Sequence, residues 1–279
     1  MPLNAKLGLA LGSGGARGFS HIGVIEELLS LGIRPQVVAG ASIGAFLGAA
    51  LAAGKLSPMR AWALSLKPRR LMSLLAPGTG GLLSTRKIMS SFLEIVGEGD
   101  IESLLMPFGA VATLVPSGKE VWFTRGSLAH AVESSMAIPG MFSPVPAGKG
   151  KWFIDGGIVD PLPVALCRAL GAEVVVAVRV DASDSRALGP AGPRGWAARL
   201  LSPFSPLGMA SAALAVMQTR LTQYRLVQEP PDVLLCPSVG HLRAFAFHRA
   251  EEAIEAGRAT VRDTLPLWHD LLLSSGPGV

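Results

Sequence analysis

The chain has few cysteines, one tyrosine and little charge. Its 279 residues include 2 cysteines, and Asp, Glu, Lys and Arg together make up only 16%. Cys167 and Cys236 cannot build a disulfide framework, and they lack the spacing of metal ligands. We therefore expect two buried packing residues, no metal site and no cofactor.

Long hydrophobic runs are also missing. No uncharged apolar run reaches the roughly 18–20 residues that a membrane-spanning helix needs. The longest candidate, Ile43–Gly54, is rich in Ala and Gly and fits a buried helix better. The apolar stretch within Met1–Leu11 is too short for a signal peptide. The sequence therefore predicts a cytoplasmic protein, with unconventional export and peripheral membrane association left open.

The charge balance limits the classes of partner. The formal net charge is +5, from 25 Lys and Arg against 20 Asp and Glu. A basic surface can meet nucleic acid or anionic lipid. Because the chain has one tyrosine and no lysine-rich tract, we expect no nucleic-acid partner. Contact with an anionic membrane stays open.

What is present is an alternation of strand-like and helix-like patterns over about the first 180 residues, which is typical of a mostly parallel sheet covered by helices. The predicted strands are Leu7–Leu11, Gln36–Ala39, Phe108–Val115, Glu120–Thr124, Trp152–Asp155, Glu173–Val180 and Asp232–Cys236. The predicted helices are Gly18–Leu31, Ala45–Leu51, Met209–Val227 and Arg249–Thr264. Pro116–Lys119 predicts a hairpin turn.

Two segments between these elements are ambiguous. Ser57–Leu83 combines apolar residues with Lys67, Arg69 and Arg70, and ends near a glycine-rich hinge. A lid or interfacial surface would have this composition, and so would a helical insertion packed on the core. Arg186–Pro206 is rich in Pro, Gly, Ala and Ser and predicts a loop.

The strongest local motif is Gly40–Gly44, which reads Gly-Ala-Ser-Ile-Gly between a predicted strand and a predicted helix. Small residues allow a sharp strand-to-helix turn that presents the hydroxyl of Ser42 at a helix N-terminus, and there we expect it to be exposed. A serine held in this way is typical of acyl-transfer and ester-hydrolysis enzymes. A structural Gly/Ser helix start remains the alternative.

A glycine loop, Gly12–Gly18, precedes this motif. A dinucleotide site would need an acidic residue about 20 residues further on, but Arg34–Gly40 contains none. Glycine amides at a strand end can instead converge on an oxyanion. If the first two strands are neighbours, this loop lies beside Ser42.

A serine nucleophile also needs a base. The five histidines, His21, His130, His241, His248 and His269, lie outside the two motifs that contain Ser42 and Asp155. Asp155 ends a short strand before Gly156 and Gly157, so it can be an exposed base at the sheet edge or an ordinary turn former. Asp160 before Pro161 predicts a helix N-cap.

Taken together and in order, these motifs resemble the patatin-like phospholipase family, in particular the bacterial branch related to the catalytic domain of neuropathy target esterase. The resemblance is close over about residues 6–180 and loose beyond. The matching segments are Gly12–Gly18, Gly18–Val24, Gly40–Gly44, Ser134–Val145, Asp155–Gly157 and Pro161–Val164.

The resemblance implies a three-layer α/β/α sandwich with a mostly parallel central sheet. It implies a single domain over residues 1–279, in which residues 186–279 supply a C-terminal loop and helices. In this family Ser42 would be the nucleophile and Asp155 the base of a Ser–Asp dyad. Gly14, Gly15 and Arg17 would form the oxyanion hole. The supporting motif residues would be Gly12, Gly18, Gly40, Gly44, Gly156 and Gly157.

The implied function is a serine lipid acyl hydrolase that acts on phospholipid or lysophospholipid esters. Met136–Phe142 and Ser57–Leu83 are compatible with a long acyl chain. One alternative is a Ser-His-Asp α/β-hydrolase that uses His241 or His248, although its serine elbow follows more strands than this chain provides. Another is a catalytically silent lipid-binding module.

Overall fold

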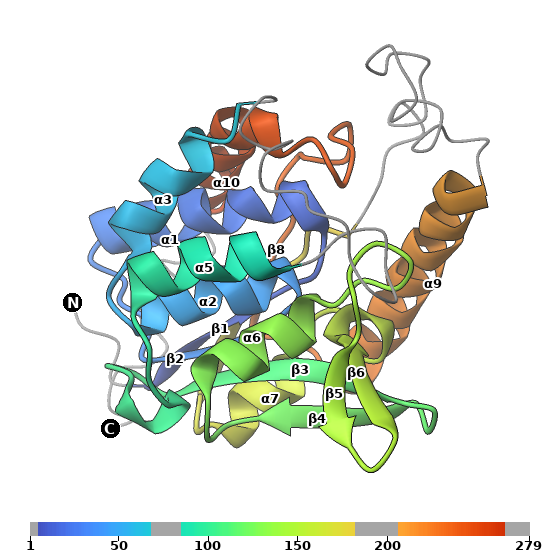
Figure 1. Cartoon of the computed structure of the whole chain (residues 1–279). Coiled ribbons are helices and arrows are strands. Elements are labelled where there is room, and N and C mark those ends of the chain that lie inside the picture. Colours follow the sequence, from blue (N-terminus) through green and yellow to red (C-terminus); the bar gives the residue numbers. More distant parts are fainter. Residues whose placement is uncertain (1–4, 68–84, 182–205, 266–279) are drawn as a thin grey trace.

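The computed structural model describes residues 5–67, 85–181 and 206–265. The strands in this part of the chain are β1 (Leu7–Leu11), β2 (Val37–Ala41), β3 (Phe108–Val115), β4 (Lys119–Phe123), β5 (Val145–Gly148), β6 (Lys151–Asp155), β7 (Val174–Val178) and β8 (Val233–Leu235). They form one eight-stranded sheet in the order β5-β6-β3-β2-β1-β7-β8, with β4 also paired to β3 (Figure 1).

The sheet is mostly parallel. The pairs β3/β2, β2/β1, β1/β7 and β7/β8 are parallel, whereas β4 and β6 run antiparallel to β3. Because β4 pairs with residues 110–114 of β3, the pairings of β3 with β2 and with β6 must share its other edge. On that edge, β2 ends with Ala41 opposite Val111, and β6 ends with Asp155 opposite Ala112.

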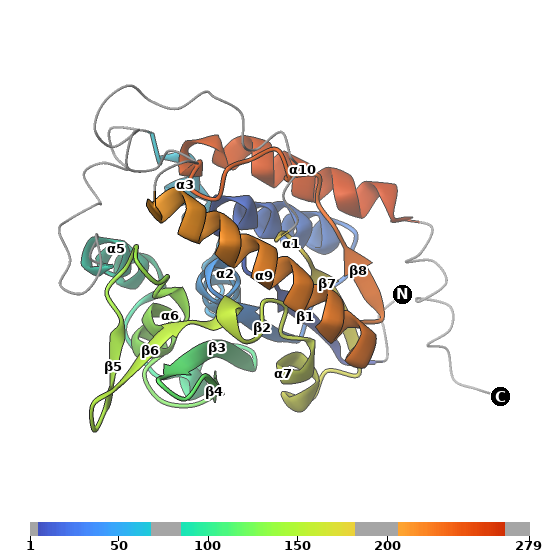
Figure 2. The ribbon, with the colours of Figure 1, turned by 90° about the vertical axis from the view of Figure 1, so that its right-hand side faces the viewer.

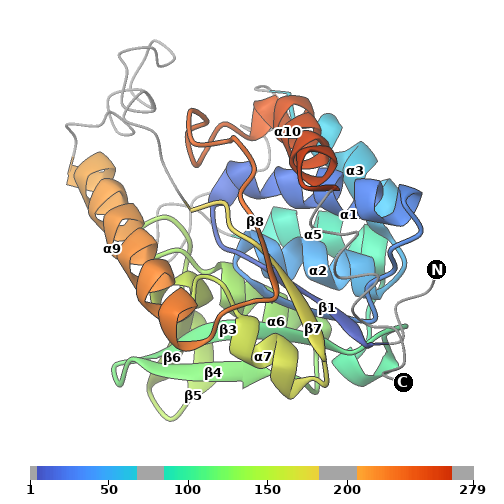
Figure 3. The same cartoon turned by 180° about the vertical axis from the view of Figure 1, so that it is seen from behind.

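Helices cover both faces of this sheet, as the sequence predicts. The large core on one face joins the sheet to α1 (Ser20–Ser30), α2 (Ile43–Ala52), α3 (Leu56–Leu64), α5 (Arg86–Val96), α6 (Leu128–Met136) and α10 (Ala250–Asp263). The smaller core on the other face joins it to α7 (Val164–Ala169) and, through Leu226, to α9 (Pro206–Gln228). Figure 3 shows α7 and α9 from behind. The fold is therefore a three-layer α/β/α sandwich.

Successive side chains of the central strands point to opposite faces of the sheet, and this alternation explains the two cores. Leu9 and Leu11 of β1 face the large core, and Ala10 between them faces the small one. All residues of β1 and β2 are buried, which a strand needs when helices cover both of its faces. The sequence-predicted strand Leu7–Leu11 is confirmed residue for residue, and the predicted hairpin of β3 and β4 is also present.

Three local predictions are wrong. The first helix begins at Ser20 and not at Gly18, because Gly15–Phe19 forms a 3₁₀ turn with φ +60° at Gly15. Asp160 is not a helix N-cap: α7 begins at Val164, and Oδ1 of Asp160 accepts the N–H of Leu162. Proline disfavours helical geometry in the residue before it, and Pro161 and Pro163 delay the helix. Cys167 is buried as expected, whereas Cys236 is exposed.

The ambiguous segments are only partly described. Residues 56–64 form α3, whose Met59 and Ala63 are buried in the large core. This part of Ser57–Leu83 is therefore a helix packed on the core. Residues 68–84 and nearly all of Arg186–Pro206 lie outside the described residues. Among the described helices, none has both the length and the apolar character needed to cross a membrane.

Candidate active site

The serine motif forms a sharp turn between β2 and α2. Ser42 has φ 56° and ψ −122°, a strained conformation for a residue with a side chain. The flanking glycines are needed because the chain packs closely here: a Cβ on Gly44 would lie 2.0 Å from the carbonyl oxygen of Leu11, and one on Gly40 would lie 2.4 Å from Ala45 N. The turn therefore holds Ser42 at the N-terminus of α2.

Asp155 lies directly beside this serine. The hydroxyl Oγ of Ser42 donates a hydrogen bond of 2.5 Å to Oδ2 of Asp155. The second oxygen, Oδ1, accepts the N–H of Gly157 at 2.8 Å. The backbone of Asp155 is fixed as well, because its N–H donates to the carbonyl of Ala137 and its own carbonyl accepts from the Thr113 hydroxyl. Two hydrogen bonds orient the carboxylate, and two more fix the backbone that carries it.

Both side chains are buried, which corrects the expectation that they are exposed. Ser42 is 4% exposed and Asp155 is 2% exposed. Burial raises the pKa of the Asp155 carboxyl from 3.8 to about 6, and the hydrogen bonds from Ser42 and Gly157 only partly oppose this. Such a carboxyl is ionised at neutral pH and is still more basic than an ordinary aspartate.

The glycine loop lies next to the serine turn, as expected from the pairing of β1 with β2. A Cβ on Gly18 would lie 2.2 Å from Cγ2 of Ile43, the residue after Ser42. The N–H groups of Gly12, Ser13 and Ala16 donate to backbone carbonyls. Those of Gly14 and Gly15 have no acceptor among the described residues.

Arg17 and His21 brace this loop. The buried guanidinium of Arg17 donates through Nε to the carbonyl of Gly14 and through Nη1 to that of Asp181, each at 3.2 Å. Nε2 of the buried His21 lies 2.8 Å from the carbonyl oxygen of Gly12. Burial lowers the pKa of His21 to about 4, so the ring is neutral and donates this bond. Both contacts fix the position of loop carbonyls.

No described histidine is hydrogen-bonded to Ser42 or Asp155. Nε2 of His241 pairs with Glu252, and His130 packs against the rings of Phe123 and Phe153. His248 is exposed in the turn before α10, and His269 lies outside the described residues. Within residues 5–67, 85–181 and 206–265, no cluster of three or more metal-binding side chains occurs.

Sequence reasoning missed two residues at this site. Oγ of Ser135, on α6, accepts the backbone N–H of Ser42 at 2.9 Å and is fully buried. Ser135 lies in the motif Ser134–Val145, so a signal was present without a role attached to it. The second is Gln218 of α9, because a Cβ on Gly157 would lie 2.6 Å from its Nε2. No pattern in the sequence indicates that contact.

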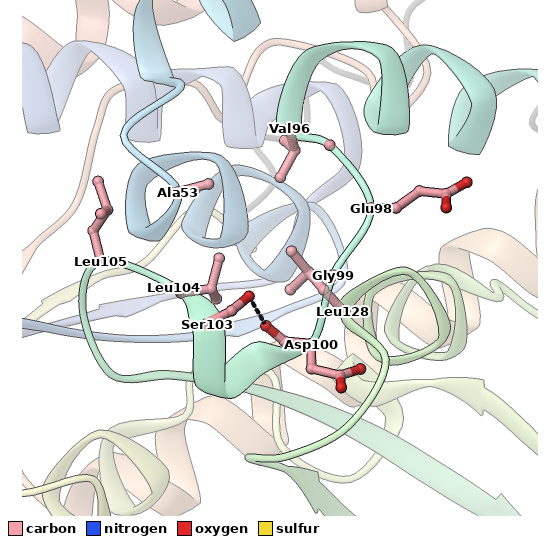
Figure 4. Close-up of a pocket in the computed structure, with 10 residues that line it drawn as sticks. Ala53, Val96, Glu98, Gly99, Asp100, Ser103, Leu104, Leu105 and Leu128 are labelled. Carbon is pink, nitrogen blue, oxygen red and sulfur yellow. Dashed lines mark hydrogen bonds between the residues drawn. The ribbon is translucent and has the colours of Figure 1, made fainter.

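A separate pocket, of about 160 Å³, lies at the other end of α2 (Figure 4). Its lining includes Ala53, Val96, Asp100 and Leu104, and Ser103 Oγ donates to the Asp100 carbonyl there. Ser42 precedes the first residue of α2, and Ala53 follows its last. A ten-residue helix is about 15 Å long, so this pocket lies far from Ser42.

Comparisons with known proteins agree with the geometry. The family model of the patatin-like phospholipases matches residues 9–168. NTE family proteins of Mycobacterium tuberculosis and Mycobacterium bovis are 41% identical over 217 residues, which cover 76% of this chain and 60% of theirs. Mouse patatin-like phospholipase domain-containing protein 7 is 30% identical over 94% of this chain and 21% of its own length.

Among solved structures, VipD from Legionella pneumophila has a similar fold. Its TM-score is 0.50 at 15% sequence identity, and the match covers 98% of this chain and 67% of VipD. This likeness concerns the fold alone. The curated relatives are longer, since the chain spans about three fifths of the mycobacterial proteins and about one fifth of the mouse protein. With its fold, its motif order and these matches, the chain belongs to the patatin-like phospholipase family and is related to the neuropathy target esterases.

Proposed function

We propose that the protein is a serine lipid acyl hydrolase in which Ser42 and Asp155 act as a dyad. The observation that carries this proposal is the direct hydrogen bond of 2.5 Å from Ser42 Oγ to Asp155 Oδ2. A serine hydroxyl at neutral pH is a weak nucleophile unless a neighbouring base accepts its proton. Asp155 is in position to accept it without an intervening histidine.

The reaction has two half-reactions. Oγ of Ser42 attacks the ester carbonyl carbon while its proton moves to Oδ2 of Asp155. The tetrahedral intermediate then expels the alcohol, which takes the proton from Asp155, and an acyl-serine remains. Water attacks the acyl-serine with its proton passing to Asp155, and the fatty acid leaves as Ser42 regains a proton. The base is restored at the end of each half-reaction.

The negative oxygen of each tetrahedral intermediate needs donors. The N–H groups of Gly14 and Gly15, which have no acceptor among the described residues, support an oxyanion hole at this loop. Arg17 adds a positive charge beside it, but its described hydrogen bonds go to carbonyls. We therefore assign Arg17 to positioning the loop. The N-terminus of α2 favours the same anion.

The proposed substrates are phospholipid or lysophospholipid esters. The segment Met136–Phe142 leads to the base, since the carbonyl of Ala137 accepts the N–H of Asp155. Its Met141 and Phe142 are buried apolar side chains, and Ile138 is half-buried. An apolar segment joined to the backbone of Asp155 suits a substrate with an acyl chain.

The test compares the wild type with Ser42→Ala on p-nitrophenyl butyrate and on lysophosphatidylcholine. We expect the variant to keep its fold by circular dichroism and to lose ester turnover and labelling by a fluorophosphonate probe. Ser90→Ala is the matched control, because Ser90 is an exposed serine on α5. Wild-type turnover in Ser42→Ala would refute the mechanism. Loss of activity on replacing His241 or His248 would favour the triad.

A further inference from the structure

Large apolar side chains are exposed along one stripe of α9. They are Met209, Val216, Met217, Tyr224 and Val227, between 56% and 84% exposed. Met209 is followed by the others at 7, 8, 15 and 18 residues, and at 100° per residue these spacings place all five within a stripe about 100° wide. α9 carries five of the eleven large exposed hydrophobic side chains of the described residues. An apolar patch of this kind marks a surface that meets a partner.

The opposite face of α9 packs against the candidate site. Gln218 reaches Gly157 in the turn that follows Asp155, and Thr222 is buried. The guanidinium of Arg225 donates to the carbonyl of Val159 at 3.0 Å and pairs with Glu120 of β4. These contacts determine which face of the helix is turned outward. Figure 2 shows α9 crossing the front of the molecule, with α2 seen nearly end-on behind it.

Two exposed tryptophans lie on the face of the sheet that α9 covers. Trp122 of β4 is opposite Val111 of β3, and Trp152 of β6 is opposite Val115. Residues directly opposite in antiparallel strands share a face, so both rings lie on the face whose core includes Val111 and Leu226 of α9. Each tryptophan is more than two fifths exposed. Exposed tryptophan beside an apolar surface is typical of the boundary between lipid and water.

The charges around the stripe are compatible with anionic headgroups. Arg220 is exposed within the stripe, 11 residues after Met209. Lys149 and Lys151 are exposed at the turn between β5 and β6, next to Trp152. The nearby acid Glu120 is already paired with Arg225. Lysine and arginine at such a boundary attract anionic lipid, and the whole chain carries a formal net charge of +5.

We propose that the outer stripe of α9, flanked by Trp122 and Trp152, docks the protein on an anionic phospholipid bilayer. Docking in this orientation places α9 between the bilayer and the turn after Asp155, which the inner face of α9 contacts through Gln218. The proposal rests on the proposed function for its choice of partner, because a lipid hydrolase finds its substrate in a bilayer. A second copy of the chain is the competing occupant.

The experiment measures binding to vesicles of phosphatidylcholine alone and of phosphatidylcholine with phosphatidylglycerol, by sedimentation. Every protein in this experiment carries Ser42→Ala, so that no lipid is hydrolysed during the measurement. The double variant Val216→Ser and Met217→Ser should bind anionic vesicles at least about tenfold more weakly, because two apolar side chains no longer leave water. Leu105→Ser is the matched control, since Leu105 is 79% exposed beside the separate pocket and should not matter.

Charge and self-association are tested separately. Replacing Lys149 and Lys151 by Glu should weaken binding to anionic vesicles and leave binding to phosphatidylcholine unchanged. Equal binding by the double variant and the parent would overturn the proposal. So would a dimer in light scattering that the double variant abolishes while vesicle binding stays the same.

The proposed function is judged by a different readout. Turnover of the soluble ester p-nitrophenyl butyrate, measured with Ser42 restored, should be the same for the double variant and the wild type. If neither protein turns over the ester, the proposed function fails while the vesicle result still stands. If the ester is hydrolysed and the vesicles are not bound, only the docking surface fails.

Discussion

Replacing Asp155 by Asn should abolish activity and make stability less dependent on pH. The carboxyl is buried, and its pKa is raised from 3.8 to about 6. Between these values the folded protein holds a proton that the unfolded chain has lost. The free energy of unfolding therefore falls as the pH rises through this window, and it becomes level above it. An amide of similar shape has no such ionisation.

The magnitude follows from the two pKa values. One pKa unit corresponds to about 1.4 kcal/mol, so a rise from 3.8 to about 6 corresponds to about 3 kcal/mol. We expect the stability of Asp155→Asn relative to the wild type to increase by about 3 kcal/mol between about pH 4 and pH 7. Other groups, such as His21, titrate in both proteins, and the comparison cancels their contribution.

Urea unfolding at a series of pH values measures this difference, with ester turnover recorded on the same samples. Asp263→Asn is the matched control, because Asp263 is exposed at the end of α10. Its stability relative to the wild type should not follow the same curve. The free energy of unfolding of Asp155→Asn minus that of the wild type should rise with pH. If this difference is constant or falls as pH rises, burial does not disfavour the charged base.

Three further predictions concern the same site. In the wild type kcat/KM should rise with pH around a midpoint of about 6, because only the ionised Asp155 accepts the proton. Stopped assays with a soluble ester measure this profile, and a flat profile from pH 5 to 8 would contradict the prediction. Ser135→Ala leaves the buried N–H of Ser42 without its acceptor, which costs about 1–3 kcal/mol. It should lower kcat and fluorophosphonate labelling far more than it changes KM, and unchanged labelling would mean that the bond does not position the nucleophile. Gly44→Ala places a Cβ 2.0 Å from a backbone oxygen and should destabilise the protein by about 3 kcal/mol or more in urea unfolding. Gly48→Ala, whose nearest neighbour is a side-chain methyl at 3.1 Å, should cost less, and equal losses would contradict the account of the turn.

Local patterns in the sequence were enough to predict much of the fold. The strand Leu7–Leu11, the β3–β4 hairpin and the strand-to-helix position of Ser42 are all confirmed, because hydrophobic period and turn residues act over a few neighbours. The predicted first residues of α1 and α7 were wrong, because the residues before each helix adopt turn geometry and the helix begins further along the chain. Asp155 was recognised from the order of motifs and not from its strand alone.

What could not be predicted depends on contacts between distant residues. Ser135 lies 93 residues from the serine whose N–H it accepts, and no local pattern marks that bond. The burial of Asp155, and hence its raised pKa, follows from elements packed around it. The spacing of the apolar residues in α9 can be read from the sequence, but their exposure and the packing of the opposite face against the turn after Asp155 cannot.

Because β2 and β6 both pair with one edge of β3, β3 determines the distance between Ser42 and Asp155. Ala41 is opposite Val111 and Asp155 is opposite Ala112, so adjacent residues of one strand set the separation of the two reacting groups. Ser42 and Asp155 are 113 positions apart in sequence, and outside β3 and the residues that contact the dyad, the intervening chain has little influence on that distance. Loops in that part of the chain can change length without moving the two groups apart, whereas a one-residue slip of β6 on β3 would turn Asp155 to the opposite face of the sheet.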